Sequence, residues 1–199
     1  PLMAIVGEPT SLGITYRHKG IGVIVVELKS SLRISSGFQH SSVKKVFKGK
    51  QGHSSRPWLG DNALDKAIDF LRSVSSSEGL YIANLEGGHA ANIIPGRAEL
   101  TLLSKAAGDA EGEFSSTRGT LPMFPAKAIT DCHESVQLVL KKLMTQVDKT
   151  FHPSTITSNF GIAKVQGDTI SLTFDFRLLP KQQIKTIFNN LSKILLGKL

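Results

Sequence analysis

The sequence predicts an α+β protein with an antiparallel sheet and helices packed on one face, a ferredoxin-like sandwich enlarged by a second lobe. Strand-like and helix-like patterns alternate in groups along the chain, which favours this class. The 199 residues are enough to bury a core and suit one large domain or two small ones. Hydrophobic residues make up 40% and charged residues 20%, which excludes a disordered chain and indicates a soluble globular protein.

Strand patterns dominate the first fifty residues. The clearest covers Ile21–Leu28, because Val23–Val26 is a run of β-branched residues. Lys29–Ser42 is rich in serine and predicts a loop. The other early strand candidates are Pro1–Val6, Ile14–His18 and Val43–Lys50.

Three segments have the spacing of amphipathic helices. Asp61–Val74 is the first, with Asp61 as its expected N-cap. Asp131–Val147 is the second, and Asp131 with Glu134 resembles a capping box. The third follows Pro180, which suits a first helical turn.

Further strands are expected between and after these helices. Thr155–Val165 and Ile170–Phe176 predict a hairpin around Gly167-Asp168. Ser104–Pro125 is rich in small residues and predicts a long connection. The two remaining strand candidates are Leu80–Leu85 and Ala98–Leu103.

The charge balance favours anionic partners, since the net charge is +8 and the sequence pI is about 9.7. The basic residues are scattered, and only 7% of residues are aromatic, so we expect no nucleic-acid binding. No apolar run is long enough to span a membrane, so no membrane partner is expected. The single cysteine, Cys132, excludes an internal disulfide, and no signal-peptide pattern is visible, so the predicted location is cytoplasmic. Because the chain begins with proline, we expect a fragment or a processed chain.

Two glycine-containing turns present polar groups that could carry chemistry. His53 lies in Gly49–Pro57, where a strand turns toward a helix, and an imidazole there could donate to an oxygen or stabilise an oxyanion. Asn92 lies in Glu86–Gly96 and could orient an amide or a carboxylate. The alternatives are a surface histidine without a role and an asparagine that only serves the turn.

Two charged residues at strand ends are the other candidates. Glu8 is followed by a proline and could bind a metal ion, or it could be an exposed turn acid. Arg177 could bind a carboxylate in a bidentate manner, or it could pair with Asp175 or lie at a solvated strand end. The six histidines show no metal-ligand spacing, and no nucleophile or phosphate-binding motif is present. The residues alone therefore favour a binding or assembly domain.

Four segments in this order resemble one family. They are Gly7–Thr10, Lys48–Pro57 with Gly60–Ala63, Gly87-Gly88 with Asn92–Pro95, and Phe174–Arg177. The set is similar to the lid, or dimerisation, domain of the zinc-dependent aminoacylase and carboxypeptidase G-like metallopeptidases, which include acetylornithine deacetylase, succinyl-diaminopimelate desuccinylase and dipeptidases. The resemblance covers most of the chain.

The resemblance implies roles for four residues. Glu8 corresponds to a ligand of one of two zinc ions, and His53 to the lid histidine that polarises the scissile carbonyl. Asn92 corresponds to a lid residue that contacts the substrate, and Arg177 to an arginine that binds its carboxylate. The implied reaction is hydrolysis of the amide bond of a dipeptide or N-acyl amino acid by metal-activated water.

The catalytic-domain motifs of that family are absent from this sequence. The resemblance therefore implies an excised lid that is inactive alone, holds no zinc stably, and has the missing catalytic domain of the same polypeptide as its partner. Residues 1–11 would end the catalytic domain, and residues 12–199 would form the lid. The insertion Ser104–Ser158 suggests two lobes, 12–104 and 105–199, with the second standing in for a partner subunit, although a homodimer stays open. The alternative is a stand-alone α+β dimerisation or small-ligand-binding module.

Overall fold

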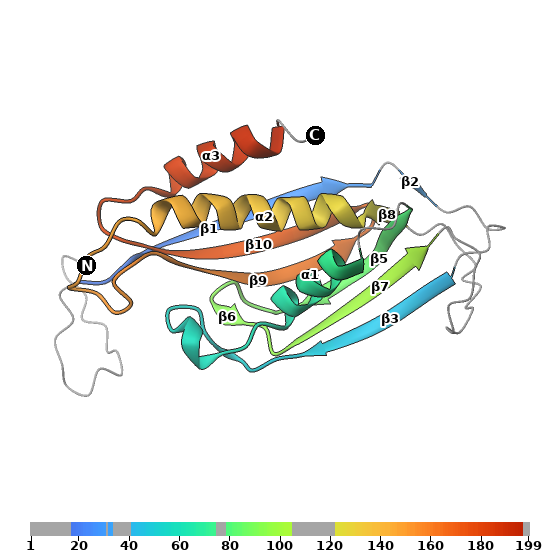
Figure 1. The fold of residues 1–199 in the computed structure, drawn as a ribbon, viewed down its shortest axis with the longest axis horizontal. Coiled ribbons are helices and arrows are strands. Elements are labelled where there is room, and N and C mark those ends of the chain that lie inside the picture. The colour runs from blue at the N-terminus through green and yellow to red at the C-terminus, as the bar shows by residue number, and fades with distance from the viewer. Residues whose placement is uncertain (1–16, 31, 34–40, 75–78, 105–121, 197–199) are drawn as a thin grey trace, which may run out of the picture.

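The computed structural model describes residues 17–30, 32–33, 41–74, 79–104 and 122–196 (Figure 1). Its main sheet has the strand order β1-β10-β9-β5-β7-β3, with antiparallel neighbours, and the short β8 pairs with β5 and β2. The strands of this sheet are β1 (Gly20–Lys29), β2 (Leu32–Arg33), β3 (Ser41–Lys48), β5 (Leu80–Gly87), β7 (Arg97–Ser104), β8 (Pro122–Pro125), β9 (Thr157–Gln166) and β10 (Thr169–Leu178). The predicted α+β class with an antiparallel sheet is confirmed.

The three α-helices of the described residues, α1 (Ala63–Val74), α2 (Ala126–Leu143) and α3 (Ile184–Leu196), lie together over one face of the sheet (Figure 1). Each presents an apolar stripe to the sheet, and burial of these stripes stabilises the fold. The fully buried core residues include Leu64, Ile68, Ile82, Leu100, Ile129, Val136, Ile170 and Phe174. Phe160 of β9 and Phe174 of β10 stack at 4.8 Å between ring centroids, which joins two strands to the same core.

The first strand of the sheet pairs with the last one. β1 and β10 are in register from Gly20–Leu178 to Lys29–Thr169, so segments from both predicted lobes share one sheet. β9 continues the sheet to β5 through the pair Gly87–Ala163. The predicted boundaries at 11/12 and 104/105 stay predictions, because the residues that follow or surround them lie outside the described ranges.

Several predicted helix ends are wrong. α1 begins at Ala63, and its cap is Asn62 rather than Asp61, because Asn62 Oδ1 accepts from the N–H groups of Leu64 and Asp65 at 2.9 and 3.3 Å. α2 begins at Ala126 rather than Asp131, so the expected capping box lies inside the helix, where Asp131 pairs with Lys127.

The third helix begins at Ile184, four residues after Pro180, which therefore lies outside its first turn. Both expected loops contain strand residues: β2 interrupts Lys29–Ser42, and β8 forms the end of Ser104–Pro125, where Tyr81 and Ile82 of β5 pair with it. The expected strand Pro1–Val6 lies outside the described residues. None of the helices in the part of the chain described is both long and apolar enough to cross a bilayer.

Candidate functional site

The two turns singled out in the sequence meet in a small antiparallel pair of strands. β4 (Gly52–His53) pairs with β6 (Ile93–Ile94), with His53 opposite Ile93. We call this two-stranded unit, whose strands come from separate segments of the chain, the hairpin. β6 lies beside β9, beyond the point where β5 ends (Figure 1). A 3₁₀ turn, η1 (Pro57–Leu59), then leads the chain toward α1. The fold therefore brings His53 and Asn92 together from separate segments.

Glycine is required where this hairpin crosses β9. Gly88 has a φ of +75°, and a Cβ at that position would lie 1.8 Å from the carbonyl oxygen of Gly161. A Cβ on Gly161 would lie 2.4 Å from the carbonyl oxygen of Ala91. The close approach lets Asn159 Nδ2 donate to the carbonyl oxygens of Ala91 and Ile93 at 2.8 and 3.0 Å. Asn159 is thereby the buried polar anchor of the hairpin.

His53 is exposed and held in one tautomer. Its Nδ1 accepts from the backbone N–H of Ser55 at 3.1 Å, and the Ser55 hydroxyl lies 2.8 Å from the same nitrogen. Because Nδ1 accepts, the neutral ring carries its proton on Nε2. His53 can therefore donate from Nε2 to an oxygen of a ligand.

The groove around His53 has a volume of about 620 Å³ and is basic. It is lined by Lys50, Gln51, Gly52, His53, Ser55, Arg56 and Leu59. Two of these residues are cationic and none is acidic, so the groove favours a negatively charged ligand.

Asn92 lies next to His53 through the hairpin, because its carbonyl oxygen accepts from the N–H of Ser54 at 2.9 Å. The residue is exposed, and its side-chain amide has no hydrogen-bond partner among the described residues. That amide is available to a ligand as both donor and acceptor.

Arg177 is buried in a polar cluster with Asp175 and Ser54, and we call these three residues the Ser54 cluster. Arg177 Nε donates to Asp175 Oδ2 at 3.0 Å, and Nη2 donates to Ser54 Oγ at 3.0 Å. Ser54 Oγ in turn donates to Asp175 Oδ2 at 2.6 Å. The pairing of Arg177 with Asp175, one of the alternatives drawn from sequence, is present. Within the part of the chain described, Nη1 has no partner, so one edge of the guanidinium remains uncommitted.

Glu8, the candidate metal ligand, lies outside the described residues. Within those residues, no group of three or more His, Cys, Asp and Glu side chains is close enough to hold a metal ion. The described part of the chain therefore does not fit a zinc site on its own, and any metal would need ligands from elsewhere.

A second histidine, His133, lies away from the hairpin, and its hydrogen bonds give it a structural role. His133 of α2 is buried, and its Nδ1 accepts from Arg72 Nη2 at 3.0 Å, because a guanidinium only donates. Its Nε2 then donates to Asp65 Oδ1 at 2.9 Å. Both ring nitrogens are used in joining α1 to α2, so His133 is a structural residue.

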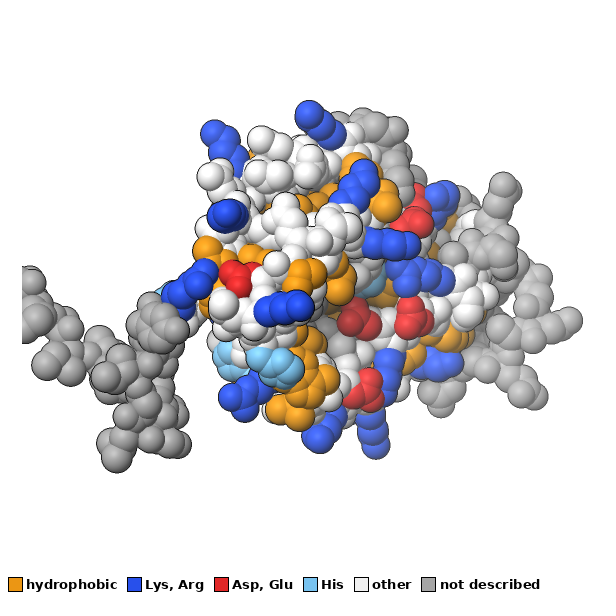
Figure 2. All heavy atoms as spheres, turned by 60° about the vertical axis from the view of Figure 1, so that its left-hand side comes forward, with side chains coloured by type: hydrophobic (Ala, Val, Ile, Leu, Met, Phe, Trp, Pro, Cys, Tyr) orange, Lys and Arg blue, Asp and Glu red, His pale blue; other side chains and the backbone are white. Residues whose placement is uncertain are grey.

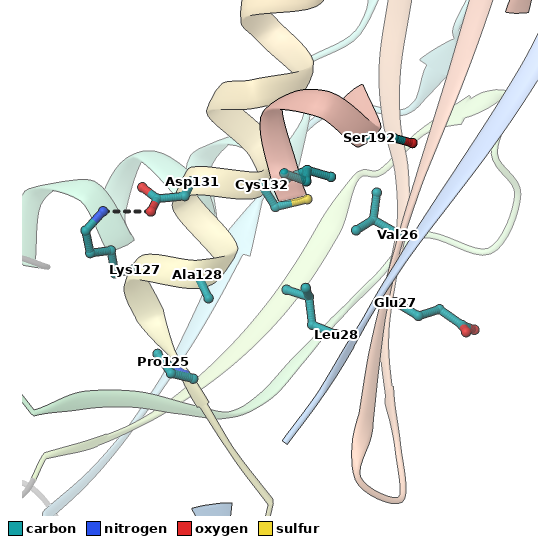
Figure 3. A pocket seen from close by; sticks show the side chains of 10 residues that line it. Val26, Glu27, Leu28, Pro125, Lys127, Ala128, Asp131, Cys132 and Ser192 are labelled. Atoms are coloured by element: carbon teal, nitrogen blue, oxygen red, sulfur yellow. Dashed lines mark hydrogen bonds and ion pairs between the residues drawn. The ribbon is translucent and has the colours of Figure 1, made fainter. Parts of the chain in front are cut away.

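A separate, largely apolar cavity of about 520 Å³ lies between β1, α2 and α3 (Figure 3). Val26 and Leu28 of β1 face Cys132 of α2 across it, and Ser192 contributes from α3. Burial raises the pKa of the Cys132 thiol to about 12, so the thiol is protonated and unreactive near neutral pH. Cys132 therefore contributes an apolar surface to this cavity rather than acid–base chemistry.

Basic side chains are spread over the end of the molecule that carries the hairpin. Figure 2 shows Lys and Arg interspersed with hydrophobic and uncharged side chains, without a continuous basic surface. Trp58 of η1 is half exposed there, and its ring lies 4.9 Å from that of His152.

The comparisons with known proteins agree with the fold. Residues 36–113 match the family model of the peptidase dimerisation domain, a segment that contains His53 and Asn92 but not Arg177. A probable carboxypeptidase of Aspergillus flavus is 32% identical over 116 residues, which cover 49% of this chain and 23% of that protein. A putative succinyl-diaminopimelate desuccinylase of Mycobacterium tuberculosis is 34% identical over 113 residues, which cover 50% of this chain and 27% of that protein.

A crystal structure of an aminoacylhistidine dipeptidase from Vibrio alginolyticus superposes with a TM-score of 0.60 at 14% identity, covering 89% of this chain and 41% of that chain. This likeness extends the shared fold beyond the segment that the family model matches. The predicted resemblance to the dimerisation domain of a peptidase and deacylase family is confirmed. The aligned part of the chain spans about a quarter of the curated relatives.

Sequence reasoning missed two residues that build the site, Ser54 and Asn159. Ser54 is the centre of the Ser54 cluster, although nothing next to it in the sequence marks it. Asp175 was found as a partner of Arg177, because it lies two residues earlier in a strand and so shares its face. Asn159 had no such signal, since its partners come from a loop far away in the sequence.

Proposed function

We propose that this chain is the lid of a zinc-dependent hydrolase that cleaves the amide bond of a dipeptide or an N-acyl amino acid. In this proposal, His53 stabilises the oxyanion, Asn92 orients the substrate, and Arg177 binds the substrate's carboxylate. The names of the relatives, a carboxypeptidase and a desuccinylase, support an amide bond near a carboxylate as the target.

The observation that carries the proposal is the convergence of the three residues on Ser54. Ser54 is covalently next to His53, its N–H donates to the Asn92 carbonyl oxygen, and its hydroxyl accepts from Arg177. Three candidates drawn from separate segments therefore meet at one end of the sheet. A histidine, an amide and a guanidinium are the donors that an amide with a nearby carboxylate requires.

The hydrogen bonds of His53 and Arg177 support a separate role in the proposed reaction for each residue. His53 donates from Nε2 to the scissile carbonyl oxygen, and this bond strengthens as negative charge develops on the oxygen. Arg177 offers Nη1 to the carboxylate while its other nitrogens are held by Asp175 and Ser54. The basic groove around His53 raises the local concentration of an anionic substrate.

The metal belongs to the rest of the proposed enzyme. Since the described residues offer no ligand set, the zinc ions would be held by a catalytic domain of the same polypeptide, with Glu8 as the proposed ligand from this chain. The chain alone is accordingly proposed to be inactive.

The continuous sheet supports a proposed role for the second lobe. β9 pairs with β5 of the family-matched segment, and β10 extends the sheet beyond β9. These two strands therefore occupy the side of β5 at which the lid of a second subunit could otherwise pair. We therefore favour a lid in which His53 acts within its own chain, with a homodimer as the alternative.

Zinc-dependent activity of the longer polypeptide that contains this segment tests the proposal. We expect hydrolysis of N-acetyl amino acids or dipeptides, with His53→Ala lowering kcat by about 10²–10³-fold. Arg177→Lys should chiefly raise KM, because it keeps the charge and loses the guanidinium geometry. A polypeptide without zinc-dependent hydrolysis, or hydrolysis by the 199-residue chain alone, would contradict the proposal, and the first outcome would favour the stand-alone binding module.

A further inference from the structure

We infer that Ser54 and Asp175 are positioning residues that hold His53 and Arg177 at a fixed separation, so that ligands are selected by the distance between their acyl carbonyl and their carboxylate. The inference rests on the proposed function and extends it to the origin of specificity. It assigns a role to two residues that touch no substrate.

The hydrogen bonds of the Ser54 cluster leave its serine no freedom to rotate. The hydroxyl donates its single hydrogen to Asp175 Oδ2 at 2.6 Å. It also accepts from Arg177 Nη2 at 3.0 Å, and it shares the single Nε–H, at 3.3 Å, with Asp175 Oδ2, so that both of its lone pairs face the guanidinium. Every hydrogen-bonding capacity of the hydroxyl is therefore used within the cluster.

Burial makes these contacts strong. The exposed fractions of Ser54, Asp175 and Arg177 are 1%, 1% and 7%. Hydrogen bonds between ionised groups shielded from water are among the stronger ones in proteins. The cluster thus fixes the hairpin to β10 across a separation of more than a hundred residues in the sequence.

Both proposed substrate contacts are attached directly to this cluster. His53 precedes Ser54 in the chain, so its backbone position follows that of Ser54. Arg177 has its Nε and Nη2 held, which leaves Nη1 as the uncommitted nitrogen among the described contacts. A carboxylate must approach that edge, and the distance from there to His53 cannot adjust to ligand length.

Asp175 provides a sharp test because its two oxygens differ. Oδ2 accepts both bonds of the cluster, whereas Oδ1 is buried and has no partner among the described residues. Asp175→Asn can keep the accepting oxygen while removing the charge, so it weakens the cluster without changing its shape. Asp168→Asn is the matched control, because it also removes a carboxylate charge. Asp168 lies in the turn between β9 and β10, away from the Ser54 cluster.

The first measurement needs no ligand. Hydrogen exchange of the Arg177 Nε–H and the Ser54 amide is followed by NMR on the 199-residue chain, with far-UV circular dichroism to verify folding. We expect both groups to exchange at least tenfold faster in Asp175→Asn and in Ser54→Ala, and unchanged in Asp168→Asn. If Asp175→Asn does not fold, Ser54→Ala decides, since it removes only one hydroxyl. Equal exchange in the wild type and Ser54→Ala would overturn the inference.

The second measurement tests the selection by length. N-acetylglycine and N-acetyl-β-alanine, which differ by one methylene between amide and carboxylate, are titrated against the chain while the His53 and Arg177 resonances are recorded. We expect at least a fivefold difference between their dissociation constants in the wild type and in Asp168→Asn, and less than twofold in Asp175→Asn and Ser54→Ala. Equal affinity of the wild type for the two ligands would overturn the selection. If neither ligand moves either resonance, the proposed function fails, while the exchange data still report on the positioning.

Discussion

The crossing of the hairpin over β9 makes Gly161→Ala the most informative single substitution for this site. A Cβ at position 161 would lie 2.4 Å from the Ala91 carbonyl oxygen, 1.0 Å inside the 3.4 Å at which ordinary contact begins. The obstructing atom belongs to the backbone, so relief requires movement of the whole 88–93 segment.

The magnitude follows from what that movement breaks. A displacement of about 1 Å away from β9 lengthens the bonds from Asn159 to Ala91 and Ile93 beyond hydrogen-bond distance. Two lost bonds account for about 1–3 kcal/mol, and residual crowding adds about 1–3 kcal/mol. The reduced entropy of the unfolded chain returns up to about 1 kcal/mol, so we expect a net loss of about 1–6 kcal/mol in the free energy of unfolding.

Urea unfolding followed by circular dichroism measures this loss, with amide exchange of Ser54 as a local probe. Gly20→Ala is the control, because a Cβ there would meet Leu178 at an ordinary 3.5 Å, and we expect a change below about 1 kcal/mol. If Gly161→Ala unfolds at the same urea concentration as Gly20→Ala and Ser54 keeps its protection, the crossing does not hold the hairpin, and the account of the site is wrong.

Three further predictions concern the helix cap, the buried thiol and the assembly state. Asn62→Ala should lower the free energy of unfolding by about 1–2 kcal/mol, because Asn62 caps α1, whereas Asp61→Ala should cost less; urea titration of both variants decides between the two caps. Burial raises the pKa of Cys132 from its ordinary 9.0 to about 12, so the contribution of the protonated thiol to the free energy of unfolding should be full below pH 9 and decline between pH 9 and 12. Thermal unfolding across this range should show a melting temperature that falls more steeply with pH in the wild type than in Cys132→Ala. Parallel curves for the two proteins would refute this prediction. Light scattering over a concentration series should give the mass of a monomer, and a stable dimer would instead favour delivery of His53 to a partner subunit.

The elements of the core were largely accessible from sequence because their signals are periodic. The apolar stripe of α1 and the alternation in β10 appear in the residues themselves, so these elements were predicted, although the start of α2 was predicted five residues too late and the short strands β2 and β8 fell in predicted loops. The helix ends were not, since more than one nearby residue can serve as the cap. Asp61 and Asn62 are adjacent candidates, and the structure distinguishes them because Asn62 accepts from the helix N–H groups while its amide donates to Asn159 and Phe160.

Individual residues of the site could be predicted from the sequence, but the hydrogen bonds that join them could not. His53 and Asn92 lie in turns whose glycines indicate unusual backbone geometry, so each could be singled out locally. The bond from Ser54 to Asp175 depends on how the hairpin crosses the sheet, and nothing near Ser54 in the sequence encodes it.

The pairing of β1 with β10 connects these observations to function. β1 comes before the family-matched segment and β10 after it, so the strand that carries Asp175 and Arg177 is fixed between the first strand and β9. A strand paired on both sides resists displacement better than an edge strand, because moving it breaks two ladders of hydrogen bonds. The sheet therefore holds the guanidinium, and the Ser54 cluster holds the His53 side to it. Loss of that cluster is the change that would free His53 to adjust to a ligand.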